Sequence, residues 1–171
     1  MVVAPYLDLL LLLLVAAAAI NDLASRRIPN ILLLSGFVSA LVLHAISLEP
    51  SKALLASLGG TIVGLLIFLP FYVVRGMAAG DVKMMATVGA FTGPAAAFHI
   101  AILAWCIGGV MALALIICRG RLRPALANFR SLARQFAFRL PAMHTEAQPS
   151  AGSMPYGVAI AAGTIYFLIS R

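Results

Sequence analysis

Two aspartates of this chain, Asp22 and Asp81, lie at the edges of long apolar segments. Asp22 directly follows one such segment, and Asp81 comes just before another. Two carboxyl groups that meet at one depth of a membrane cannot easily both ionise, so they share a proton. The ionised group can then take a proton from water while its protonated partner donates to a carbonyl oxygen. The pair therefore indicates peptide hydrolysis that needs neither a metal nor a covalent nucleophile.

A structural interpretation of the same two residues is also open. Each aspartate can be a plain interfacial charge, with Asp22 paired to Arg26 one helical turn further on. A carboxylate costs on the order of 2.5–3.5 kcal/mol at the membrane centre and less at the interface, so such groups tend to be functional or paired. The spacing alone does not decide between these interpretations. Solvation explains the three other acids, which are Asp8, Glu49 and Glu146.

The composition argues against most soluble classes of protein. Hydrophobic residues make up 63% of the 171 residues and charged residues only 10%. A typical soluble domain is about 45–50% apolar and about 25% charged. A soluble globular domain, a disordered chain and a nucleic-acid-binding domain are all disfavoured, although the net charge is +7. The basic residues instead indicate a membrane pattern, which makes the lipid bilayer a predicted partner.

Six apolar runs predict an all-α polytopic membrane protein, with about six transmembrane helices in a single domain over residues 1–171. Each run must be helical because lipid cannot satisfy an open backbone. The fourth run is short, and it can span only with Val82 and Lys83 at its base or with local thinning of the membrane. Gly93-Pro94 predicts a turn into the fifth run, although these two runs could also form one long bent helix. The runs are Tyr6–Ile20, Ile31–Leu48, Ala53–Val74, Met84–Gly93, Ala95–Cys118 and Tyr156–Ile169.

Glycine pairs inside these runs predict close packing between helices. Gly60 and Gly64 lie four residues apart, which lets another helix approach closely. Gly59-Gly60 and Gly108-Gly109 lack the Lys and Ser/Thr of a phosphate-binding loop, so they too are interpreted as packing sites.

The basic residues predict the orientation of the chain. With the N-terminus outside, ten of the twelve Lys and Arg residues fall in inside loops, and only Lys52 and Arg171 lie outside. Loops rich in Lys and Arg stay on the cytoplasmic side. Both termini are thus predicted outside, and Asp22 and Asp81 at the cytoplasmic face. The ten inside residues are Arg26, Arg27, Arg75, Lys83, Arg119, Arg121, Arg123, Arg130, Arg134 and Arg139.

The basic loop at about 119–153 is the only long polar stretch. Its apolar residues fall on one narrow helical arc flanked by arginines, which predicts an amphipathic helix at the inner membrane surface. Anchoring to anionic lipid is the simpler role for it, and docking of a cytoplasmic partner is the alternative. The arc consists of Leu126, Phe129, Ala133, Phe136 and Leu140.

The local sequences around both aspartates carry a more specific signal. Residues 22–30 read Asp-Leu-Ala-Ser-Arg-Arg-Ile-Pro-Asn, and residues 76–83 read Gly-Met-Ala-Ala-Gly-Asp-Val-Lys. This pattern resembles the type IV prepilin peptidases, the aspartic membrane proteases of the GxGD class. It is most similar to the short form found with Flp-type (Tad) pilus systems. The resemblance covers about residues 8–118 and includes the six-span layout.

This resemblance implies a function for the two carboxyl groups. Asp22 and Asp81 would be the catalytic pair of an aspartic endopeptidase in the bacterial inner membrane. The substrate would be a prepilin or pseudopilin with a short basic leader, a glycine before the cut and a hydrophobic helix after it. The cut would fall at the cytoplasmic face, and pilus-assembly machinery would be a further partner. No cofactor is implied.

One position departs from the family pattern. Ala78 stands where the first glycine of GxGD is expected. A glycine there could be needed for a positive φ or for close approach of the substrate backbone, and alanine is unfavourable at positive φ. Gly76 and Gly80 remain, so activity is still expected, although reduced activity is open. The cysteine-rich insertion of the long-form enzymes is absent, which predicts cleavage without N-methyl transfer.

Three residues near the aspartates have both a structural and a functional interpretation. Lys83 can anchor the chain at the inner face, or it can act on an aspartate or a substrate carboxylate. Pro29 biases Ile28 away from helix, and Asn30 is predicted to cap the second span. Together, Pro29 and Asn30 would help to fix the direction of Asp22.

Other classes of function find less support. The three histidines are scattered and form no His-Glu-x-x-His motif, so no metal site is predicted. A small proton-coupled transporter or channel remains an alternative, because intramembrane acids also act as proton relays. A non-catalytic pilus-assembly protein with the same fold is a second alternative, for which Ala78 is the only hint.

Overall fold

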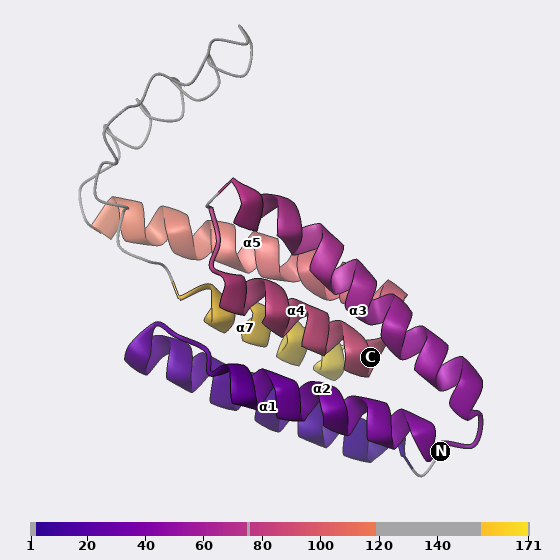
Figure 1. The fold of residues 1–171 in the computed structure, drawn as a ribbon. Helices are drawn as coiled ribbons and strands as arrows, with labels where there is room; N and C mark the ends of the chain where they lie inside the picture. The colour runs from indigo at the N-terminus through magenta and orange to yellow at the C-terminus, as the bar shows by residue number, and fades with distance from the viewer. Residues whose placement is uncertain (1–2, 75, 119–154, 171) are drawn as a thin grey trace, which may run out of the picture. The chain divides into compact units, whose positions relative to one another are not determined.

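The computed structural model describes residues 3–74, 76–118 and 155–170, and within these ranges every regular element is an α-helix. Each of the six predicted apolar runs corresponds to one helix. The fold class, an all-α polytopic membrane protein, is therefore confirmed. The helices are α1 (Ala4–Ser25), α2 (Asn30–Ala45), α3 (Pro50–Val73), α4 (Ala79–Thr92), α5 (Pro94–Cys118) and α7 (Tyr156–Ile169) (Figure 1).

The chain divides into two compact units. One consists of Met1–Gly108 with Pro155–Arg171, and it contains both buried aspartates and their contacts. The other is Gly109–Met154, of which only the end of α5 is described. The amphipathic helix predicted at about 119–153 lies outside the described residues. The prediction of one domain over residues 1–171 stays a prediction.

Within the described ranges, three helices, α1, α3 and α5, are long and apolar enough to cross a membrane, and α2 and α7 are shorter apolar helices. Large apolar side chains such as Leu13, Leu34 and Ile62 are exposed on their outer faces. A soluble protein rarely leaves so much contiguous apolar surface uncovered. Lipid is the solvent that suits this surface.

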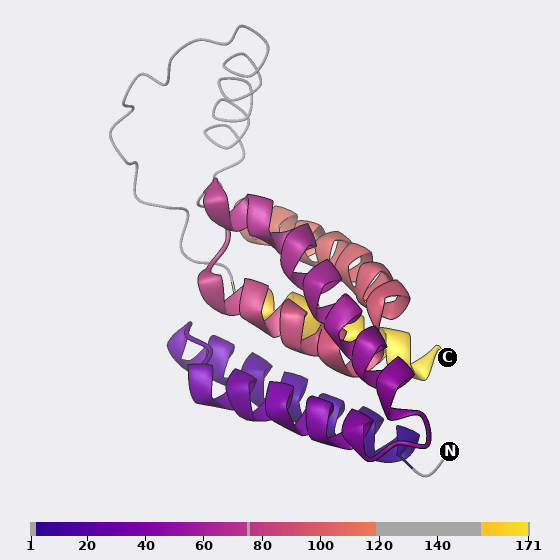
Figure 2. The ribbon, with the colours of Figure 1, turned by 45° about the vertical axis from the view of Figure 1, so that its right-hand side comes forward.

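Helix α4 is buried on nearly all sides. It has 14 residues, which corresponds to about 21 Å of rise, and it includes Val82 and Lys83 as predicted. Every residue from Asp81 to Phe91 is buried except Lys83. Helices α1, α2, α3 and α7 all pack against it, and α4 lies between α3 and the α1–α2 pair in both views (Figures 1 and 2). A short helix with so little polar surface forms because its neighbours supply an apolar environment.

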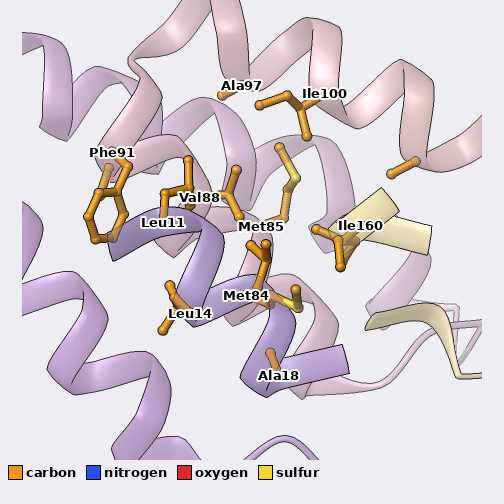
Figure 3. Close-up of a cluster of buried hydrophobic side chains, with 14 of the residues drawn as sticks. Leu11, Leu14, Ala18, Met84, Met85, Val88, Phe91, Ala97, Ile100 and Ile160 are labelled. Carbon is orange, nitrogen blue, oxygen red and sulfur yellow. The ribbon is translucent and has the colours of Figure 1, made fainter. Parts of the chain in front are cut away.

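The core gathers around α4. Met84, Met85 and Val88 of α4 are fully buried, and Leu11 of α1 and Ile160 of α7 are buried with them. These side chains point toward one another from helices that are distant in the sequence (Figure 3). Flexible methionines fill the irregular space between converging helices. The first turn of α4 is thereby held at a fixed place against α1 and α7.

Glycines bring α3 and α4 into backbone contact. A Cβ on Gly60 would collide with the carbonyl group of Gly89, and a Cβ on Gly64 would collide with that of Met85. The predicted role of Gly60 and Gly64 in close helix approach is confirmed. This seam lets no side chain intervene between the two helices along the middle of α4.

At the C-terminal end of α4, side chains from two other helices reach one backbone carbonyl group. Pro94 has no N–H, so the carbonyl of Ala90 loses its ordinary intrahelical donor. The Ser57 hydroxyl donates to that oxygen at 2.8 Å, and His44 Nε2 lies 3.1 Å from it. Gly93 then turns the chain at a φ of 79°. Helices α4 and α5 are therefore separate, and the alternative of one long bent helix is wrong.

Candidate active site

Asp22 lies in the last turn of α1. The helix continues to Ser25 and ends because Arg26 adopts a left-handed conformation, with a φ of 53°. The Arg26 N–H closes this turn by donating to the backbone carbonyl of Asp22 at 2.9 Å. The Asp22 side chain is only 6% exposed. A carboxyl group at this depth needs a polar partner, because burying a polar group without one is costly.

That partner is the first turn of α7. The N–H of Gly157 donates to Asp22 Oδ2 at 2.8 Å. The first N–H groups of a helix have no intrahelical acceptor, and the helix dipole favours negative charge there. Helix α1 therefore delivers a carboxylate to an end of α7 that is suited to bind one. Arg26 also lies within electrostatic range of Asp22.

Asp81 lies in the first turn of α4. The backbone enters the helix from an extended Ala78, with a φ of −78° and a ψ of 150°. The Asp81 N–H donates to the Ala78 carbonyl at 3.1 Å. Its side chain is 5% exposed, so both candidate carboxyl groups are buried.

The structure brings these two carboxyl groups together. Helix α1 packs against both α4 and α7, and the Asp22 carboxyl group lies within electrostatic range of Asp81. Like charges held close together in an apolar environment disfavour double ionisation. Two aspartates separated by 59 residues in the sequence are thus near enough for their charges to interact.

Ile28 packs between the two helix ends that carry this site. Its side chain lies 3.5 Å from where a Cβ of Gly80 would be, and 3.2 Å from where a Cβ of Gly157 would be. The residue sits in the extended segment between α1 and α2, which Pro29 keeps out of helix. This apolar side chain therefore lies beside the first turns of both α4 and α7.

Ala78 imposes no backbone strain. In the described ranges, only Arg26 and Gly93 have a positive φ. The concern that this position needs glycine for a left-handed conformation is therefore answered by the structure. At Gly80 a Cβ would make only ordinary contact with Ile28, and Gly76 is exposed.

Lys83 and Asn30 form an exposed link between α4 and α2. Lys83 Nζ donates to Asn30 Oδ1 at 3.0 Å. The predicted capping of α2 by Asn30 is wrong, because Pro29 holds the cap position and no side chain caps the helix. Asn30 is already the first helical residue, and Lys83 takes its side-chain oxygen instead.

Three residues at the site were not singled out from the sequence as site residues. They are Ile28, Gly157 and Tyr156. The hydroxyl group of Tyr156 donates to the Ala104 carbonyl at 3.4 Å, and Tyr156 lies within electrostatic range of Asp81. Tyr156 also covers Gly108, which confirms that glycine as a packing site. The sequence contained one local signal, for Gly157. Glycine has a low helix propensity, so a glycine in the first turn of an apolar helix indicates a specific role there.

The described parts of the chain contain no group of three or more His, Cys, Asp or Glu side chains that could hold a metal ion. Both cysteines, Cys106 and Cys118, are free and exposed. At the N-terminal end of α4, the polar groups include the carboxyl groups of Asp22 and Asp81, the Tyr156 hydroxyl group, the Gly157 N–H and the Lys83–Asn30 pair.

Comparison with known proteins identifies one related family. The model of the type IV leader peptidase family matches residues 9–113. This range contains both buried aspartates and the segments that precede α2 and α4. No curated protein and no solved structure matches the chain.

Proposed function

Since the chain belongs to the type IV leader peptidase family and is a peptidase, we propose that it is an aspartic endopeptidase. Its substrates are type IV or Flp-type prepilins, or pseudopilins, and it cuts the basic leader after a glycine. One observation carries this proposal above all. Two separate helices deliver one buried carboxyl group each, Asp22 and Asp81, into a single apolar site.

The chemistry follows from one proton shared by two carboxyl groups. The ionised carboxylate takes a proton from water as the water oxygen bonds to the scissile carbonyl carbon. The protonated carboxyl group donates to the carbonyl oxygen, which becomes the hydroxyl group of a tetrahedral intermediate. Collapse of this intermediate breaks the C–N bond as the leaving nitrogen takes the proton that the first carboxylate removed from water. A hydroxyl group of the intermediate returns a proton to the second carboxyl group, which restores the pair. The products are the leader acid and a pilin with a new N-terminus.

The location of the site suits a substrate with an apolar helix. Both aspartates lie at helix ends, Asp22 at the end of α1 and Asp81 at the start of α4. The clustered basic residues support a cytoplasmic location for these ends in the bacterial inner membrane, with both termini outside. The helix of the prepilin would stay in the lipid while its leader reaches the carboxyl groups from the cytoplasm. Pilus-assembly machinery would receive the product, and methyl transfer is not expected.

The test is cleavage of a co-expressed Flp-type prepilin, with mass spectrometry of the new N-terminus. We expect a cut directly after the leader glycine in the wild type and none in Asp22→Asn or Asp81→Asn. Asp8→Asn is the matched control, because it makes the same change at the other end of α1. Membrane levels of all variants are compared by immunoblot. Cleavage that persists in either site variant would contradict the proposal.

The same experiment separates the alternatives. A transporter would move ions along a gradient whether or not a prepilin is present. A non-catalytic assembly protein would support piliation while both aspartates are replaced. Neither would produce a leader fragment that depends on Asp22 and Asp81.

A further inference from the structure

We propose that Gly157 is a positioning residue for the reaction: its N–H fixes the Asp22 carboxylate, and its lack of a side chain leaves room for that carboxylate. This inference rests on the proposed function, since it assigns a role in orienting one member of the pair. It concerns α7, whose residues lie beyond the part of the chain matched by the family.

The first step is the hydrogen bond. Gly157 N–H donates to Asp22 Oδ2 at 2.8 Å across 135 residues of sequence, and the contact is buried. A backbone donor in the first turn of a helix has little freedom to move. It therefore defines both the place and the direction of the oxygen that it binds, which is the preorganisation that a reacting group requires.

The second step is the space around Gly157. A Cβ there would lie 2.8 Å from Asp22 Oδ2 and 3.2 Å from Asp22 Cγ. It would also lie 3.2 Å from Ile28 Cδ1. The tightest contact thus falls on the carboxylate itself. The φ of Gly157 is not positive, so the backbone does not require glycine. Room for the Asp22 carboxylate is what the missing side chain provides.

The same helix contains a matched control. Gly163 is also buried, and a Cβ there would lie 3.1 Å from Ala104 N, 3.3 Å from Leu103 Cβ and 3.4 Å from the Ile100 carbonyl oxygen. This contact is tight too, but it involves α5 and neither aspartate. Gly157→Ala and Gly163→Ala therefore introduce the same methyl group into two crowded places on α7, only one of which touches the site.

The experiment measures kcat and KM of the full-length chain in proteoliposomes, with the prepilin that the wild type cleaves. Gly157→Ala should lower kcat by roughly 100-fold, because a displacement of about 1 Å at a reacting group costs that much. KM should stay within about twofold, since a group that acts in the transition state leaves substrate binding unchanged. Gly163→Ala should retain kcat within about threefold at equal membrane levels.

A second variant distinguishes the effect of the contact with the Asp22 carboxylate from the effect of the contact with Ile28. Ile28→Val removes the Cδ1 atom that a Cβ at position 157 would meet, but it leaves the contact with Asp22 Oδ2. We expect that Gly157→Ala combined with Ile28→Val stays as slow as Gly157→Ala alone, with Ile28→Val alone as its reference. Recovery of kcat in the combined variant would overturn the proposal, because packing against Ile28 would then be the cause.

The remaining outcomes keep this proposal distinct from the proposed function. Equal losses of kcat in Gly157→Ala and Gly163→Ala would overturn the positioning role while the peptidase stands. A rise in KM at constant kcat in Gly157→Ala would overturn it as well. An Asp22→Asn variant that cleaves as fast as the wild type would instead refute the proposed catalytic pair, and the role of Gly157 with it.

Discussion

The two ends of α4 differ in the partners that they provide for buried polar groups. At the C-terminal end, the carbonyl that Pro94 leaves without a helical donor lies within reach of both Ser57 and His44. At the N-terminal end, the structure gathers two like-charged groups, Asp81 and Asp22. The first arrangement satisfies a hydrogen-bonding requirement, and the second creates repulsion that folding has to overcome.

Under the proposed function, the first arrangement contributes to stability and the second serves the reaction. A carbonyl group with hydrogen-bond donors, such as that of Ala90, stabilises the folded state and has no role in the proposed reaction. A pair of buried carboxyl groups costs folding energy and is retained where it does work, because strained and repulsive features cluster at functional sites. Between these two ends, the glycine contacts at Gly60 and Gly64 join α3 and α4 into one frame.

The largest effect on stability is expected from breaking this frame. Gly60→Ala places a methyl group against the Gly89 carbonyl, and overpacking against backbone costs about 1–3 kcal/mol or more. Its neighbour Gly59 is the matched control, since a Cβ there would lie 3.7 Å from Pro94 in ordinary contact. Thermal unfolding in detergent measures both variants. Equal melting temperatures for Gly60→Ala and Gly59→Ala would show that the seam does not hold the frame.

A smaller effect is expected at the C-terminal end of α4. Ser57→Ala removes one donor from the Ala90 carbonyl at a cost of about 1 kcal/mol, because His44 still reaches the same oxygen. Ser57→Ala combined with His44→Ala should cost more than the sum of the single changes, since the carbonyl then has no donor. Unfolding of the four proteins completes the cycle, and simple additivity would contradict a shared acceptor. Prepilin cleavage should survive in each variant that remains folded.

The smallest effect is expected at Lys83. Its Nζ binds Asn30 at the surface, and exposed contacts of this kind change stability by no more than about 0.5 kcal/mol. Lys83→Met should therefore lower prepilin cleavage by no more than about threefold, with the melting temperature nearly unchanged. A loss of cleavage comparable to that of Asp81→Asn would place Lys83 in the reaction and would change the account of this end of α4.

The sequence was sufficient to predict the helices because lipid leaves the backbone few choices. All six apolar runs became helices, and the turn at Gly93-Pro94 was readable from two residues. The two aspartates were found because charge is rare in apolar segments. Their proximity could be expected only from a common depth in the membrane, and in the structure α1 packs against α4.

Features that depend on distant contacts were not predictable. Asn30 has the chemistry of a helix cap, but Lys83 from another helix takes its side-chain oxygen. The sequence shows that Pro94 lacks an N–H. It does not show that Ser57 and His44 reach the carbonyl group left without a donor. Gly157 gave a weak local signal, and its partner lies 135 residues away. In each case a tertiary contact overrides what local propensity indicates.

The central claim is that Asp22 and Asp81 act as one unit, and a double-mutant cycle tests it most directly. Prepilin cleavage is measured for the wild type, Asp22→Asn, Asp81→Asn and the double variant at equal membrane levels. Members of one catalytic unit are strongly non-additive. Each single change should therefore lower kcat at least about a thousandfold, and the double variant should be no slower than either single variant. Effects that multiply, or a single variant that retains cleavage, would show that the two aspartates act separately.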